Sequence, residues 1–109
     1  MPADATKYLW DAREATARMA RFAQGKSIDD YLADELLRAA IERQFTILGE
    51  ALGRLRQLDA ATAARITDLP RAVALRNLLV HAYADIDDRI VWGVITGQLA
   101  RLVAELDAI

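Results

Sequence analysis

Apolar residues recur every three to four positions along most of the chain, which is the spacing of one buried helix face. The first such stretch covers residues 4–24, where Asp4 is a suitable N-cap and Gly25 a suitable C-terminal stop. Its apolar face consists of Tyr8, Ala12, Ala15, Met19 and Phe22. This pattern predicts a first long helix.

A second, longer periodic stretch follows a short polar connection at residues 26–31. The connection offers three capping side chains for the element after it, namely Ser27, Asp29 and Asp30. The predicted helix begins at about Tyr31 or Asp34 and ends at Gln57. Its apolar face consists of Leu37, Ile41, Phe45, Leu48, Leu52 and Leu55.

Three further helices complete the pattern. Asp59 and Thr62 begin a short alanine-rich helix that reaches Ile66, and Pro70 suits the first turn of a fourth helix over residues 70–82. Asp87 can cap a last helix over residues 88–106. The apolar face of that last helix consists of Val91, Ile95, Leu99, Leu102 and Leu106.

Composition supports the helical pattern. The chain holds 22 alanines and 15 leucines, and hairpin dipeptides such as Asn-Gly are missing. Its 109 residues suffice for one core and leave no room for a second lobe. The sequence therefore predicts one all-α domain over residues 1–109, an up-and-down bundle of four to five helices.

The formal net charge of -2 is the sum of three regional charges that differ in sign. Residues 1–35 carry 5 basic and 7 acidic side chains, residues 36–83 carry 7 and 4, and residues 84–109 carry 2 and 5, giving -2, +3 and -3. The basic side chains of the middle region are Arg38, Arg43, Arg54, Arg56, Arg65, Arg71 and Arg76. The chain is not a general nucleic-acid binder, but its middle can attract a small anionic target.

Several classes of site are excluded or disfavoured. Without cysteine there is no disulfide scaffold, thiolate zinc site or cysteine nucleophile, and the expected compartment is the reducing cytoplasm. No apolar run approaches the roughly 18 residues of a membrane span, and Asp4 and Lys7 interrupt any signal peptide. The acidic residues Asp85, Asp87 and Asp88 more often cap a helix than hold a cation, so we expect no metal and no cofactor.

Four glycines lie at four-residue spacings inside predicted helices, namely Gly49, Gly53, Gly93 and Gly97. This spacing is not that of a phosphate-binding loop. We expect these glycines to let helices approach closely, within the chain or between two copies.

The segment that remains as a candidate for chemistry is residues 75–83. Arg76, Asn77, His81 and Tyr83 place a cation, an amide, an imidazole and a phenol within eight positions of an aliphatic stretch. An ideal helix puts Arg76 and His81 about 140° apart around its axis and about 7.5 Å apart along it. The two converge on one phosphate only if the long Arg reaches round and the helix loosens near His81, or if a second chain faces it.

These groups suit RNA cleavage by internal attack of the ribose 2′-hydroxyl. An imidazole exchanges protons near neutral pH, and a guanidinium binds the non-bridging phosphate oxygens, so no metal is required. One His per chain cannot easily serve as both acid and base, which favours a site shared between two protomers. The plainer alternative is a His that caps or packs and an Arg that is a solvated surface group.

The arrangement Arg76-Asn77-x3-His81-x-Tyr83 resembles the Arg-x4-His-x-Tyr motif of HEPN domains, in particular the HepT-like group of small bacterial toxins. The resemblance extends to residues 40–51 and 86–92 and covers nearly the whole chain in the same helical order. Ala82 departs from the group, in which larger or charged residues are common at this position.

The resemblance implies a homodimeric helical bundle whose two motifs face one another and act as a metal-independent endoribonuclease. By position, Arg76 and His81 are the expected catalytic residues, and Asn77 and Tyr83 support them. HepT-like toxins are paired with a minimal nucleotidyltransferase antitoxin that transfers AMP to the motif Tyr, here Tyr83. The added nucleotide places bulk and negative charge two residues from His81, which blocks the cleft and repels RNA.

Three functions are compatible with the sequence. The first is a toxin ribonuclease, for which Arg43 and Arg71 of the basic middle region are candidate RNA contacts. The second is a non-catalytic HEPN module that binds a nucleotidyltransferase partner or a nucleotide. The third is a structural helical dimer with a vestigial motif. The intact motif and the basic middle region favour the first.

Overall fold

The computed structural model describes residues 3–81 and 86–109, and within them every regular element is a helix. This confirms the all-α prediction. In chain order the described helices are α1 (Ala3–Ala23), α2 (Ile28–Ala33), α3 (Glu35–Leu58), α4 (Ala60–Ala63), α5 (Leu69–His81), α6 (Asp88–Gly97) and α7 (Leu99–Asp107).

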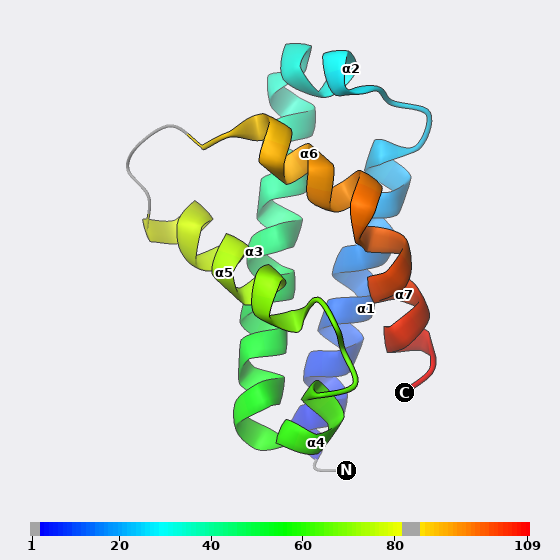
Figure 1. Cartoon of the computed structure of the whole chain (residues 1–109), viewed down its shortest axis with the longest axis vertical. Coiled ribbons are helices and arrows are strands. Elements are labelled where there is room, and N and C mark those ends of the chain that lie inside the picture. Colours follow the sequence, from blue (N-terminus) through cyan, green and yellow to red (C-terminus); the bar gives the residue numbers. More distant parts are fainter. Residues whose placement is uncertain (1–2, 82–85) are drawn as a thin grey trace.

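The two longest helices, α1 and α3, lie side by side and run in opposite directions (Figure 1). Helix α5 packs obliquely against α3, while α7 descends along α1 towards the end of the molecule where the chain begins. Helix α6 crosses the other end of this pair and contacts α2. The motif helix α5 is therefore supported mainly by α3.

The predicted apolar faces form the core. All six apolar positions predicted for α3 are buried, and so are the five predicted for residues 88–106. On α1, Ala12, Ala15 and Met19 are buried, while Tyr8 and Phe22 pack at its edge. Helical periodicity thus identified many of the residues that hold the bundle together, although Leu9, Tyr31 and Ile66 are also buried and were not predicted.

The predicted connection at residues 26–31 is wrong, because most of it folds as α2. Ser27 Oγ accepts a hydrogen bond from the Asp30 backbone N–H at 3.1 Å, and the Asp30 carboxylate accepts one from the Ser27 N–H at 2.8 Å. This reciprocal capping box starts a separate short helix and lowers the pKa of Asp30. Asp34 then adopts an extended backbone and caps α3 by accepting the Leu37 N–H.

Other boundaries differ by a few residues. Ala3 is already helical, so Asp4 lies in the first turn of α1, not at its N-cap, where its charge still complements the helix dipole. Gly25 has φ of +72°, which confirms its predicted role as the stop. Asp59 caps α4 as predicted, but that helix ends at Ala63 and does not reach Ile66.

The predicted continuous helix over residues 88–106 is also wrong, since Gln98 leaves helical geometry and separates α6 from α7. Gly97, a weak helix former, directly precedes the break. The bend lets Trp92 of α6 stack on Tyr31 with ring centroids 5.0 Å apart, while α7 packs along α1. No described helix combines the length and apolar character needed to cross a bilayer.

Candidate functional site

Arg76 lies at the closest approach of α5 to α3, and Gly49 makes that approach possible. A Cβ atom at position 49 would overlap Arg76 Cβ and lie 2.7 Å from the carbonyl oxygen of Ala72. The prediction of close helix approach is therefore confirmed at Gly49. A Cβ at Gly53 would make only an ordinary 3.9 Å contact with Val73, and one at Gly93 or Gly97 would meet nothing within 4 Å.

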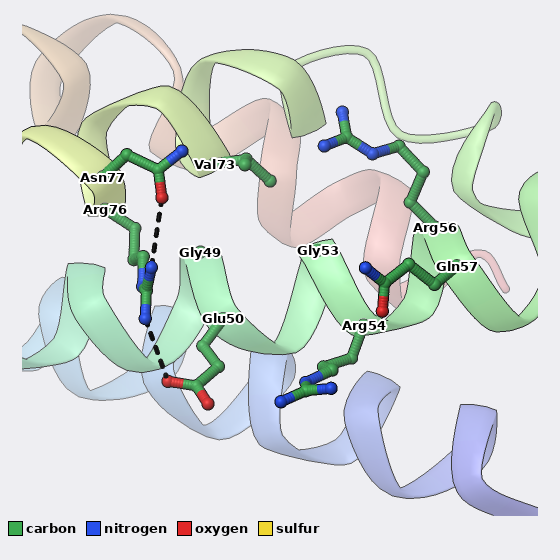
Figure 2. A pocket seen from close by; sticks show the side chains of 9 residues that line it. All are labelled: Gly49, Glu50, Gly53, Arg54, Arg56, Gln57, Val73, Arg76 and Asn77. Carbon is green, nitrogen blue, oxygen red and sulfur yellow. Dashed lines mark hydrogen bonds and ion pairs between the residues drawn. The ribbon is translucent and has the colours of Figure 1, made fainter.

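The guanidinium of Arg76 contacts Asn77 and Glu50 but does not use all of its hydrogen-bond donors within the described residues (Figure 2). Its Nη1 donates to Asn77 Oδ1 at 3.1 Å, and its Nη2 lies 3.7 Å from Glu50 Oε2. The Nε atom is buried without a hydrogen-bond partner among the described residues. An ion pair to a carboxylate as exposed as Glu50 contributes about 0 to 1 kcal/mol, so an incoming phosphate can displace it.

A hollow of about 410 Å³ runs between α3 and α5 next to this guanidinium. We call it the arginine groove. Figure 2 shows Gly49 and Gly53 on the stretch of α3 between Arg76 at one end and Arg54 and Arg56 at the other. The residues that line the arginine groove are Gly49, Glu50, Gly53, Arg54, Arg56, Gln57, Val73, Arg76 and Asn77. Three cations against one carboxylate give the groove a positive potential.

Apart from Arg76, the arginines of the basic middle region fall into two groups. Arg38 donates to backbone carbonyls of α2, and Arg65 donates to the carbonyl of Ala108, so both have structural roles. A second group is exposed and forms no hydrogen bond or ion pair with residues 3–81 or 86–109; its members are Arg43, Arg54, Arg56 and Arg71. This second group is available to bind an anion.

The two predicted RNA contacts lie in different places. Arg43 lines a hollow of about 290 Å³ between α1 and α3, which shares Glu50 and Arg54 with the arginine groove. Arg71 lines a separate hollow of about 440 Å³ between α5 and α6. The structure thus brings Arg43, but not Arg71, to the edge of the arginine groove.

His81 is exposed in the last turn of α5. Because α5 runs through both residues without interruption, Arg76 and His81 lie on different faces of one helix. The loosening of the helix that would let both converge is therefore not found within α5. Tyr83, expected to support catalysis and to accept AMP, lies outside the described residues.

A polar cluster holds the start of α6 against its neighbours. Asp87 caps α6 by accepting the Arg89 N–H, and Asp88 lies 3.7 Å from the Arg38 guanidinium. Burial, reinforced by the carboxylate of Asp88, raises the pKa of Glu42. Burial and then the Glu42 carboxylate raise the pKa of the Tyr31 hydroxyl far above its ordinary value. The start of α6 is thereby tied to α2 and α3.

Within the described part of the chain, no three His, Asp or Glu side chains come together as a cation site. The acidic residues that we considered for a cation include Asp85, which lies outside that part.

Sequence reasoning missed the arginine groove as a site. Arg54 and Arg56 were recognised only as members of the basic middle region, and Glu50 only as part of residues 40–51, which resemble the HepT-like group. The Gly49 and Gly53 spacing was the available signal, because two glycines one helical turn apart leave a bare strip of helix surface. Which helix would cover that strip could not be read from the sequence.

Comparison with known proteins places these features in context. Residues 12–109 match the family described as ribonuclease HepT-like. A candidate RNase of Methanocaldococcus jannaschii, MJ1380, is 23% identical over 97% of this chain and 96% of its own length, and a second, MJ0127, is 24% identical over 97% and 87%. A probable ribonuclease HepT of Thermococcus cleftensis is 25% identical over 92% and 90%. No solved structure matches the chain significantly.

Proposed function

This chain belongs to the HepT-like ribonuclease family, and from that membership we propose that it is a metal-independent endoribonuclease, the toxin of a toxin–antitoxin pair. The observation that carries the proposal is the placement of Arg76, which Gly49 holds at the end of a groove with two further arginines that pair with none of the described residues. A solvated surface Arg has no such support.

In the proposed reaction, the ribose 2′-oxygen attacks the adjacent phosphorus and the bond to the 5′-oxygen breaks. One imidazole accepts the 2′-hydroxyl proton, and a second donates a proton to the leaving oxygen. Arg76 binds the non-bridging oxygens in place of its weak ion pair with Glu50 and stabilises the charge of the transition state. The products are a 2′,3′-cyclic phosphate and a free 5′-hydroxyl.

We propose that a homodimer supplies the second imidazole. Arg76 and His81 of one chain lie on different faces of α5, so a facing copy is the simpler way to unite them. Three large apolar side chains close to the motif are exposed: Leu78 is 47% exposed, Val80 42% and Ile90 58%. An apolar surface of this kind is typical of a face that another chain covers.

Cleavage of RNA by the purified protein in excess EDTA tests the function. We expect His81→Ala and Arg76→Ala each to lower the rate by at least about 100-fold, because each removes a group that acts in the transition state. Arg21→Ala, which removes an exposed cation from the last turn of α1, is the control. Cleavage that survives both motif substitutions contradicts the assignment.

The second candidate, a non-catalytic module, has its own signature in the same experiment. It predicts a stable complex with a nucleotidyltransferase and no cleavage by the wild-type chain. The family comparison gives the catalytic function the stronger support.

We further propose that a nucleotidyltransferase antitoxin silences the protein by adding AMP to Tyr83. Negative charge two residues from His81 repels the RNA phosphates. After coexpression with the nucleotidyltransferase of the adjacent reading frame, we expect intact-mass spectra to show AMP additions that Tyr83→Phe removes. An unmodified wild-type chain, or additions that persist in Tyr83→Phe, would count against this regulation.

A further inference from the structure

The arginine groove contains more positive charge than the cleavage chemistry requires. Arg76 is the only one of its three arginines with a catalytic role in the proposed reaction. Arg54 and Arg56 are both exposed and unpaired with any described residue. We propose that the arginine groove binds the phosphodiester backbone of single-stranded RNA beside the scissile phosphate, with Arg54 and Arg56 as its phosphate contacts. This inference rests on the proposed ribonuclease function.

The unpaired state of these two arginines is informative because other arginines of the chain are used structurally. Arg101 binds Asp68 through two hydrogen bonds of 2.6 and 2.8 Å, and Arg13 binds the carbonyls of Leu106 and Ile109. Arg54 and Arg56 have no such partner in the described chain, although Glu50 lines the same groove. Their guanidinium donors are free for an external anion.

The floor of the groove suits a nucleic-acid strand. Gly53 carries no side chain, and only Val73 lies within 4 Å of a Cβ at that position, whereas Gly49 is covered by Arg76 and Ala72 of α5. A strand can therefore approach the surface of α3 closely at Gly53 while cations flank it. Gln57 and Asn77 line the two ends and offer neutral donors and acceptors to sugars or bases.

The groove also continues beyond Arg54. The hollow between α1 and α3 shares Glu50 and Arg54 with it and adds Arg43, together with Lys7 and Asp11, which form an ion pair of 3.1 Å with each other. Positive side chains thus continue from Arg76, past Arg54, to Arg43, a longer track than one phosphate needs. Glu50 lies where the two hollows meet and is the one carboxylate that lines both. It opposes a polyanion there, in addition to its ion pair with Arg76.

Binding of a fluorescein-labelled single-stranded RNA, measured by anisotropy over a range of KCl concentrations, tests the proposal. All proteins carry His81→Ala, so that no RNA is cut. We expect Arg54→Ala with Arg56→Ala to raise the Kd roughly tenfold or more and to reduce the salt slope by about 1.4, because each lost phosphate contact on a single strand removes about 0.7.

The matched control removes two exposed cations elsewhere, with Arg21→Ala and Lys26→Ala. Arg21 is ten residues beyond Asp11, the last α1 residue that lines the hollow containing Arg54, so about 15 Å along the helix separates them. Circular dichroism melting curves establish that all variants fold. If the groove variant and the control have the same Kd and salt slope, the proposal is overturned.

Glu50→Gln supplies an opposite expectation. Removing this carboxylate removes repulsion from both hollows, so we expect a Kd several-fold lower than that of the parent. An unchanged or higher Kd overturns the proposed position of the RNA.

The two proposals fail in different ways. If the wild-type chain cuts RNA and the double arginine variant keeps its KM, the groove proposal is wrong and the function stands. If the wild-type chain does not cut RNA, but its binding depends on Arg54 and Arg56, the ribonuclease function is wrong and the groove remains a binding site.

Discussion

At position 49, the absence of a side chain determines where a cation on the neighbouring helix can lie. Any Cβ there would overlap Arg76 and crowd the backbone of Ala72, so α3 and α5 pack this closely only with glycine. The four-residue spacing of the glycines predicted a close approach, but it could not distinguish Gly49 from Gly53, Gly93 or Gly97. That distinction depends on which atoms lie opposite, and only the fold supplies them.

Substitution of the two glycines of the arginine groove tests this difference. Gly49→Ala forces α3 and α5 apart, and we expect it to lower the free energy of unfolding by about 1 to 3 kcal/mol and to reduce cleavage strongly. Gly53→Ala makes an ordinary 3.9 Å contact and improves helix propensity, so we expect stability to be unchanged or to rise by up to about 1 kcal/mol. Chemical denaturation and RNA cleavage measure both effects.

If Gly49→Ala keeps wild-type stability and activity, the close approach does not position Arg76. A Gly53→Ala variant that is as damaged as Gly49→Ala would show instead that any methyl group on α3 disturbs the bundle.

At the scale of the helices, sequence signals located the long elements but failed at two places. The short helix α2 was taken for a connection, and the break between α6 and α7 was not predicted. Asp87 was recognised as a candidate cap and Asp59 as the start of a helix, and each accepts a hydrogen bond from the first turn of that helix. Asp34 was recognised only as a possible start of α3, and it proves to be the cap. The error at residues 26–31 arose because three capping side chains in six residues are equally typical of a loop. The error at Gln98 arose because the apolar spacing continues through the bend, so periodicity alone contains no sign of it.

At the scale of the whole molecule, the arrangement of α5 and α6 leaves an apolar face uncovered. Leu78 and Ile90 both line the hollow of about 440 Å³ between these helices, and both are about half exposed. Gly93 lines the same hollow and has nothing within 4 Å of a Cβ. We propose this face for the contact with a second copy, which would bring a second His81 to the site.

Light scattering at micromolar protein concentration tests the dimer. We expect the wild-type chain to have twice the mass of the protomer, and Leu78→Asp with Ile90→Asp to give a folded monomer that no longer cleaves RNA, because burying these carboxylates in an interface is costly. Leu36→Asp is the control, since Leu36 is 79% exposed and lies in the first turn of α3. A monomeric wild-type chain would refute the shared site.

By itself, the sequence determined the helical class, most of the buried positions on the long helices and the positions of the motif residues, because these depend on local spacing along one chain. It also located the cations of the middle region. Only the tertiary structure decided which of those cations are already paired, which glycine allows two helices to touch, and that Arg54, Arg56 and Arg76 line one groove. These properties depend on residues distant in sequence being brought together, and spacing along the chain does not contain that information.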